Sequence, residues 1–206
     1  MRHRTIVAVS AGLGQPSSTR LLADRLTSAT ASALRADGVE PELETIELRE
    51  YAQDLTNHLL TGFPSPRLQT AIERVLSADG IIAVSPIFSA SYSGLFKMFF
   101  DVIERDGLAG KPVLIAATGG TARHSLALEH AFRPLFAYLN AATVPTSVFA
   151  ASEDWAQGDA GAEASLVERL ERAARELAFA VRTRRSTTGT DPYQEPIPFE
   201  QLLAGK

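Results

Sequence analysis

Short apolar runs alternate with longer stretches of helical periodicity along most of the chain. The apolar and β-branched runs predict strands over residues 5–9, 43–48, 81–84, 112–117 and 143–149. Between them, apolar residues recur at intervals of three and four, which predicts helices over residues 19–35, 67–78, 93–105, 125–139 and 163–182. Residues 52–66 include two prolines and show no clear period, so we expect a loop there.

This alternation of strands and helices is typical of an α/β protein with a doubly wound parallel sheet. We expect one domain over residues 1–182, because no linker or internal repeat interrupts that stretch. Residues 183–206 differ, since they are polar and contain Pro192, Pro196 and Pro198. Proline cannot continue a helix, so we expect an extended C-terminal tail.

Composition narrows the classes of function. The chain has 206 residues and a formal net charge of -4, which argues against a nucleic-acid-binding protein. It contains no cysteine, and its four histidines lack the spacing of metal ligands, so no metal site is expected. The apolar run at residues 4–10 is too short for a signal peptide, and no later run is long enough to span a membrane. We therefore expect a cytoplasmic protein that has no membrane partner.

The loop after the first predicted strand is suited to an anion. Ser10 begins the loop directly after the strand, and Ser17, Ser18 and Thr19 place three successive hydroxyls at the start of the next helix. Backbone amides and the helix dipole favour negative charge there, and the hydroxyls add donors that suit a phosphate monoester, whereas simple capping needs only one. The loop lacks the P-loop lysine and the third glycine of a dinucleotide motif, so a mononucleotide phosphate fits it better than a pyrophosphate.

Two further loops follow the third and fourth predicted strands. Ligands of parallel sheets bind beyond the carboxyl ends of the strands, so these loops should lie beside the first one. The earlier loop brings backbone amides and an aromatic ring to this edge, and the paired glycines of the later one suit either a sharp turn or a close approach to a flat ligand. The candidate binding residues in the two loops are Pro86, Ile87, Phe88, Ser89, Thr118, Gly119 and Gly120.

The same loops carry a resemblance to a known family. The first motif is Pro86-Ile87-Phe88 followed by Ser93-Gly94-Leu95-Phe96-Lys97 and Asp101, and the second is the stretch TGGTARHSLALEHAFRPLF. They resemble the NAD(P)H-dependent FMN reductases, in particular those that supply reduced flavin to luciferase-like two-component monooxygenases. The resemblance covers about residues 4–182. It implies a flavodoxin-like three-layer sandwich whose five-stranded parallel sheet has the order 2-1-3-4-5.

This resemblance implies an oxidoreductase that reduces FMN with NADPH or NADH. The phosphate would be held by Ser10, Ser17, Ser18 and Thr19, and the flavin ring would lie along residues 86–89 and 118–120. Hydride passes from the nicotinamide to flavin N5 without a protein acid or base, so no catalytic side chain is expected. The family also implies a homodimer or homotetramer and a flavin-dependent monooxygenase that receives the reduced flavin.

The roles of several side chains near the loops stay open at this point. Many family members have an arginine soon after the first strand, whereas here either Arg20 or no cation at all would hold the phosphate. Lys97 and Asp101 are interpreted as structural or interface residues. Arg123 and His124 are either ligands of a nicotinamide-nucleotide phosphate or an exposed start of a helix.

Three other functions stay open. An NAD(P)H-dependent quinone or azo-compound reductase shares the fold and differs only in its electron acceptor. A flavodoxin-like electron carrier would have a more acidic surface and a T/S-x-T-G-x-T phosphate loop, which this chain lacks. A regulatory domain that binds a nucleotide would do so without consuming NAD(P)H.

Overall fold

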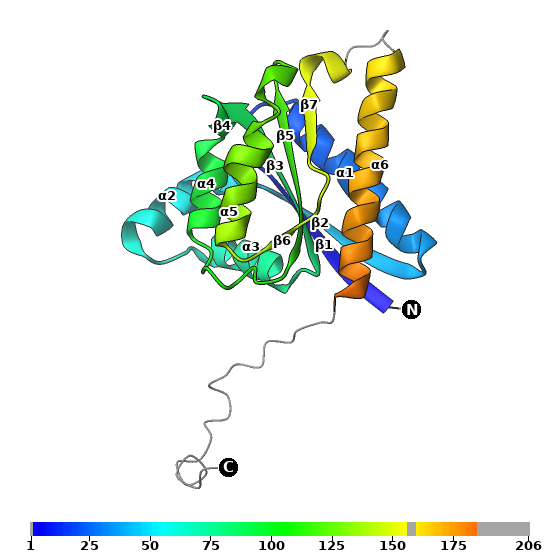
Figure 1. The fold of residues 1–206 in the computed structure, drawn as a ribbon. Coiled ribbons are helices and arrows are strands. Elements are labelled where there is room, and N and C mark those ends of the chain that lie inside the picture. Colours follow the sequence, from blue (N-terminus) through cyan, green and yellow to red (C-terminus); the bar gives the residue numbers. More distant parts are fainter. Residues whose placement is uncertain (1, 156–159, 185–206) are drawn as a thin grey trace, which may run out of the picture.

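Helices cover both faces of a central sheet, which gives the three layers expected (Figure 1). The computed structural model describes residues 2–155 and 160–184, so the predicted tail lies outside the described residues from residue 185 onward. Within the described chain the sheet has seven strands. Its long parallel part consists, in spatial order, of β2 (Val39–Glu47), β1 (Arg2–Ser10), β3 (Gly80–Phe88) and β5 (Pro112–Gly119).

The strand predicted over residues 143–149 is divided in two. The short strands β6 (Ala142–Thr143) and β7 (Val148–Ala151) pair with opposite ends of β5. Pro145 lies between them and has no amide hydrogen for a strand ladder. Arg133 instead donates to the carbonyl oxygens of Val144 and Pro145, both at 3.3 Å. With β5 as the fourth strand and this pair as the fifth, the predicted order 2-1-3-4-5 is confirmed.

Alternate side chains of the strands enter two separate cores. Ile6 and Ala8 of β1 belong to the core beneath α1 (Ser18–Ala36) and α6 (Ala160–Thr183), whereas Val7 and Val9 belong to the opposite one. The opposite core is covered by α2 (Ala52–Thr61), α3 (Pro66–Ser77), α4 (Gly94–Asp101) and α5 (Arg133–Tyr138). In the described part of the chain, no helix is both long and apolar enough to cross a membrane.

The prediction of a loop over residues 52–66 is wrong for its first part, because residues 52–61 form α2. Leu55 is the buried residue of this helix, and Leu59 and Leu60 are 47% and 81% exposed, so the helix packs on the core through a narrow contact. The two prolines follow the helix. Gly62, with a φ of 80°, ends it in the left-handed conformation that glycine adopts readily.

The helix predicted over residues 125–139 is also interrupted. The chain first forms a 3-10 turn, η2 (Ala122–His124), then a π-helical turn, η3 (Leu128–Phe132), and only then α5. Pro134 explains this change, because it has no amide hydrogen to donate to the carbonyl four residues earlier. A wider turn before the proline accommodates that missing hydrogen bond.

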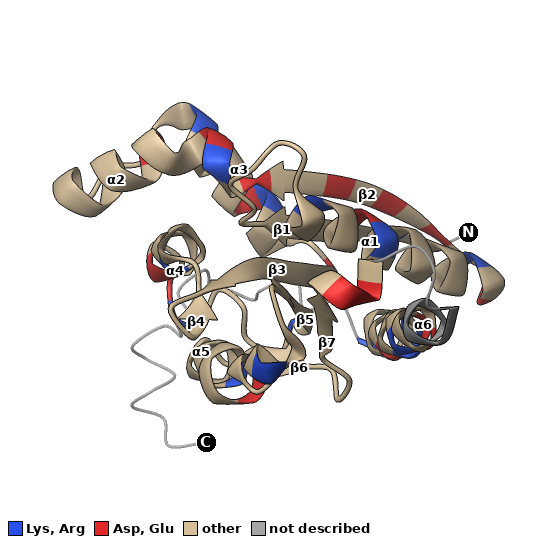
Figure 2. Ribbon diagram, turned by 90° about the horizontal axis from the view of Figure 1, so that it is seen from above, with Lys and Arg blue, Asp and Glu red and all other residues tan. Residues whose placement is uncertain are grey.

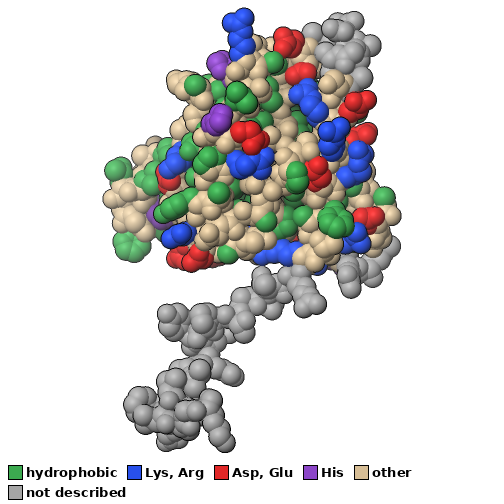
Figure 3. Space-filling view, in the orientation of Figure 1, with side chains coloured by type: hydrophobic (Ala, Val, Ile, Leu, Met, Phe, Trp, Pro, Cys, Tyr) green, Lys and Arg blue, Asp and Glu red, His purple; other side chains and the backbone are tan. Residues whose placement is uncertain are grey.

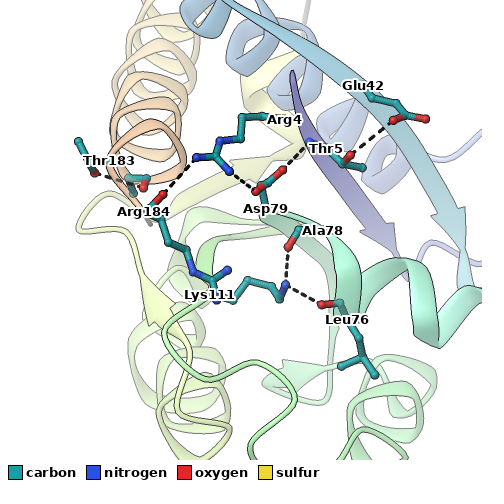
Figure 4. A network of polar contacts seen from close by, with 10 residues as sticks. Arg4, Thr5, Glu42, Leu76, Ala78, Asp79, Lys111, Thr183 and Arg184 are labelled. Carbon is teal, nitrogen blue, oxygen red and sulfur yellow. Dashed lines mark hydrogen bonds and ion pairs between the residues drawn. The ribbon is translucent and has the colours of Figure 1, made fainter. Parts of the chain in front are cut away.

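A polar network joins β1, the start of β3, the start of β5 and the end of α6 at the amino end of the sheet (Figure 4). Arg4 Nη1 lies 2.6 Å from Asp79 Oδ1, and Arg4 Nη2 donates to the carbonyl oxygen of Arg184 at 3.1 Å. Lys111 is almost entirely buried, and its Nζ donates to two carbonyl oxygens at the end of α3. The ammonium group therefore caps α3 and ties β5 to it.

Burial of this lysine predicts a pH dependence of stability. The pKa of Lys111 is lowered to about 8, first because burial disfavours the charged form and then because of the positive charge of Arg184, while Asp79 acts in the opposite direction. Between pH 8 and 10.5 Lys111 binds a proton in the unfolded chain and not in the folded chain. The contribution of this lysine to the free energy of unfolding should therefore rise with pH across this range, by up to about 3 kcal/mol.

Lys111→Met removes this titration and leaves two carbonyl oxygens unpaired, at a cost that does not depend on pH. We expect the difference in unfolding free energy between the wild type and Lys111→Met to grow as the pH rises through this range. Urea unfolding of both proteins in the same buffers measures it. A difference that stays constant would show that Lys111 is not held in a water-excluding site.

Candidate functional site

The three candidate loops meet at one edge of the sheet, because β1, β3 and β5 are adjacent and parallel. Figure 2 looks down onto this edge. The strand register places Ser10 beside Val84, and Pro86 beside Thr118. The loop that follows each strand therefore begins at nearly the same level, which allows one ligand to contact all three.

The first loop has the geometry of an anion site. Ser17 is the N-cap of α1, and its Oγ accepts a hydrogen bond from Arg20 N at 3.2 Å. The first intrahelical bond runs from Leu21 N to Ser17 O, so the amides of Ser18 and Thr19 precede the hydrogen-bonded ladder. Ser18 is exposed at the helix start. These two amides and the Ser18 hydroxyl are donors suited to a phosphate.

Two of the predicted phosphate residues are buried beneath this loop. Ser10 and Thr19 are 1% and 2% exposed. Thr19 Oγ1 lies 2.8 Å from Thr118 Oγ1, which is 4% exposed at the end of β5. This hydrogen bond connects the first and third loops across 99 residues of sequence. It joins candidate residues that were identified separately, and it fixes the spacing between the two loops.

The second loop is a β-hairpin, which the sequence did not predict. β4 (Ser91–Tyr92) runs antiparallel to β3, with Ile87 opposite Tyr92 and Phe88 opposite Ser91. The turn residues Ser89 and Ala90 have φ values of 48° and 68°, as a two-residue type I′ turn requires. Neither is glycine or asparagine, so both residues store backbone strain, which is often found at functional sites.

The hairpin is anchored at its base and exposed at its tip. Ser85 is fully buried, and its Oγ accepts a hydrogen bond from Ser93 N at 2.9 Å. Pro86 and Ile87 are half-buried, whereas Ser89 is exposed and Phe88 is 48% exposed. An aromatic ring on a fixed hairpin at the ligand-binding edge provides a surface on which a flat ligand can lie.

The two glycines of the third loop serve different purposes. A Cβ on Gly119 would lie 2.8 Å from Cζ of Phe149, so this position needs glycine because the Phe149 ring packs against its backbone. A Cβ on Gly120 would have no heavy atom within 4 Å. The flat group close to Gly119 is thus a side chain of the protein itself, and the exposed backbone at Gly120 is the part that is open to a ligand.

The arginines beside the first loop are already paired. Arg20 Nε lies 2.8 Å from Asp24 Oδ1, and Arg20 Nη1 lies 2.5 Å from Glu47 Oε1. These contacts, with the Asp24 hydrogen bond foremost, raise the pKa of Arg20. Arg49, which the sequence did not single out, forms an ion pair with Glu47 at 3.3 Å, and the side-chain amide of Gln15 lies against its guanidinium with the oxygen assigned to that side. With both arginines engaged, the second interpretation, a phosphate held by neutral donors, is favoured.

Lys97 and Asp101 lie one helical turn apart on α4 and form an ion pair. They line a groove of about 680 Å³ between α4 and α5, which also reaches Tyr92 of the hairpin. Other lining residues of this groove are Tyr92, Phe100, Arg105, His130, Leu135 and Tyr138. Figure 3 shows apolar side chains beside charged ones on the face that carries these helices. Lys97 and Asp101 therefore lie on this face, whereas Phe96 of the same motif packs against Tyr92 of the hairpin.

Comparison with known proteins identifies the family. The model of the family described as NADPH-dependent FMN reductase matches residues 4–156. The FMN reductase (NADPH) of Pseudomonas aeruginosa is 39% identical over 150 residues, which are 73% of this chain and 78% of that relative. The NADH-dependent FMN reductase SfnE of Pseudomonas putida is 38% identical over 151 residues, again 73% of this chain and 78% of the relative.

Solved structures agree with this result. An oxidoreductase from Corynebacterium diphtheriae superposes with a TM-score of 0.85 at 43% identity, covering 90% of this chain and 100% of the other. A WrbA-like flavodoxin protein from Agrobacterium tumefaciens, at 18% identity and a TM-score of 0.58 over 88% of this chain and 99% of its own, shares the fold. The predicted flavodoxin-like fold is thereby confirmed, and the chain belongs to the family of NADPH-dependent FMN reductases.

Proposed function

We propose that this protein catalyses the reduction of FMN by NADPH or NADH. The observation that carries the proposal is the convergence of three loops at one sheet edge, with the anion site of the first loop tied to the third through Thr19 and Thr118. A mononucleotide needs a phosphate site and, next to it, a surface for a flat ring. The helix start at Ser18 provides the former, and the hairpin with Phe88 provides the latter.

The residues fit FMN in the following way. The Ser17 and Ser18 hydroxyls and the free amides of the first turn of α1 would hold the phosphate. Ser10 and Thr19, both buried, would support this loop from beneath. The ring would lie along residues 86–89 and against residues 118–120, where the exposed backbone at Gly120 leaves room for its pyrimidine edge.

FMN, when bound, supplies the atom that accepts hydride. The protein contributes alignment: the strained hairpin and the Thr19–Thr118 hydrogen bond hold the loops at a set spacing, so that a nicotinamide can stack on the outer face of the ring. No proton has to move to or from a side chain in this step. The amides of the third loop would stabilise negative charge on the reduced ring.

The proposal includes assembly of the protein into a homo-oligomer. The groove between α4 and α5 exposes Tyr138, with 64% of its surface accessible, next to Leu135 and Phe100. This face supports the expected homodimer or homotetramer, and sedimentation velocity of the full chain tests that state.

The reduced FMN would pass in the cytoplasm to a flavin-dependent, luciferase-like monooxygenase. The motif over residues 118–136 supports this inference.

The proposed function predicts saturable oxidation of NADPH or NADH when FMN is added to the purified protein. The measurement follows the nicotinamide absorbance band with FMN, riboflavin or a quinone as the acceptor. We expect FMN to be preferred over riboflavin, because riboflavin lacks the phosphate that α1 would bind. Turnover with the quinone alone, through flavin that stays bound, would identify a quinone reductase. Absence of nicotinamide oxidation with every acceptor would overturn the assignment as an enzyme.

A further inference from the structure

Arg123 differs from the other arginines near the candidate site. Arg20 and Arg49 are both paired with Glu47. The Arg123 side chain is exposed, and its guanidinium forms no hydrogen bond or ion pair with residues 2–155 or 160–184. An arginine without a carboxylate partner keeps its full capacity to bind an anion.

The backbone beneath Arg123 is held in place. Thr121 caps η2: its Oγ1 accepts from Arg123 N at 3.4 Å, and its carbonyl oxygen accepts from His124 N at 3.3 Å. Ser125 N closes the turn on Ala122 O at 3.0 Å. The turn also packs near β7, the neighbour of β5. Arg123 therefore projects from an anchored turn that begins directly after Gly120.

This turn directly follows the third loop, against which the flavin ring would lie. A nicotinamide stacked on a flavin between the second and third loops leaves the adenosine half to run outward over the rim of the site. η2 is the first structure on the rim beyond the third loop. His124 is the next residue of this turn and is likewise exposed. Asp154, on the same edge, forms an ion pair with Arg169 and accepts a hydrogen bond from the backbone amide of Ala151. Its negative charge is therefore balanced.

The two coenzymes differ at a single group, the phosphate on the 2′ oxygen of the adenosine ribose of NADPH. This phosphate carries nearly two negative charges and three acceptor oxygens, and arginine is the side chain that binds such a group in a bidentate manner. An arginine near the adenosine ribose is also how dinucleotide sites accommodate the 2′-phosphate. The relatives of this chain include both an NADPH-dependent and an NADH-dependent enzyme, so family membership alone does not decide the coenzyme.

We propose that Arg123 binds the 2′-phosphate of NADPH and makes this protein prefer NADPH over NADH. The inference rests on the proposed function, since it concerns the coenzyme of that same reaction. It assigns Arg123 to specificity and gives it no part in hydride transfer.

The test compares kcat/KM for NADPH and for NADH at saturating FMN in the wild type, Arg123→Ser, Arg123→Lys and Arg172→Ser. Arg172 is the matched control, because it is an exposed arginine on α6 whose side chain likewise has no described partner. We expect Arg123→Ser to lower kcat/KM for NADPH by about 10- to 100-fold, the loss of a charge-assisted contact. The value for NADH should stay within about twofold, because NADH lacks the group that Arg123 binds.

Two further readouts sharpen the test. Arg123→Lys should keep part of the NADPH preference, since it retains the charge and loses the bidentate geometry. Adenosine 2′,5′-bisphosphate should inhibit the wild type more strongly than ADP does, and this advantage should disappear in Arg123→Ser. Arg172→Ser should match the wild type in every measurement.

Equal losses with both coenzymes in Arg123→Ser, or a wild type that uses NADH as well as NADPH, would overturn the inference. Neither result would affect the proposed function, because both require an active FMN reductase. Failure of the wild type to oxidise either coenzyme would instead reject the proposed function, and it would be seen before any variant is compared.

Discussion

Replacing Gly12 with alanine is expected to raise the KM for FMN by at least about a hundredfold, the loss of two charge-assisted hydrogen bonds to a phosphate. Gly12 is a buried residue of the first loop. A Cβ there would overlap Ser17 Oγ and lie 3.1 Å from Cβ of Thr19. It would displace the N-cap hydroxyl of α1 and push the loop away from the position that the Thr19–Thr118 hydrogen bond sets.

Riboflavin separates loss of the phosphate site from general damage to the protein. Because riboflavin has no phosphate, its reduction should change by less than about threefold in Gly12→Ala. Gly94→Ala is the control, since a Cβ at this exposed helix position would have no heavy atom within 4 Å. Steady-state kinetics with both flavins give the comparison. Equal losses with FMN and riboflavin would show that this loop does not bind the phosphate.

Replacing Phe96 with alanine is expected to lower the free energy of unfolding by about 3–5 kcal/mol, the usual cost of removing a buried phenylalanine. Phe96 is 0% exposed on α4. Its ring centroid lies 4.7 Å from that of Phe100, 5.2 Å from that of Phe132 and 5.5 Å from that of Tyr92. This cluster packs α4 against η3 and against the hairpin that carries Phe88, so its loss affects both the core and the site.

Phe63→Ala is the matched control for this variant. Phe63 follows α2 and is 80% exposed, so its replacement should change stability by less than about 0.5 kcal/mol. Urea unfolding of the three proteins, followed by circular dichroism, measures both effects. A Phe96→Ala protein within about 1 kcal/mol of the wild type would mean that the aromatic cluster is not closely packed.

The long strands and most helices could be predicted because their sequences record local burial. Residues 81–84 and 112–117 are continuously apolar, and both segments are buried on the two faces of the sheet, as β3 and β5. α2 was missed because the two prolines that suggested a loop lie beyond its end, at residues 64 and 66. Pro134 and Pro145 can be read from the sequence, but their structural effects depend on the neighbouring segments. These effects are the π-helical turn before Pro134 and the division of the last strand around Pro145.

For the candidate site, the sequence by itself determined which loops lie at the carboxyl edge of the sheet, because every strand of a parallel sheet delivers its following loop to the same edge. It also determined the hydroxyl-rich helix start and, through the motif, the family. Only the tertiary structure decided that Thr19 faces Thr118 and that Gly119 accommodates the Phe149 ring. It also decided that Arg20 is held in ion pairs whereas the Arg123 side chain has no partner among the described residues. The strained turn at Ser89 and Ala90 was likewise seen only in the structure. The physical reason is that periodicity reports how each segment is buried, whereas a hydrogen bond, a ring contact or an ion pair joins segments that are distant in sequence and exists only once the chain has folded.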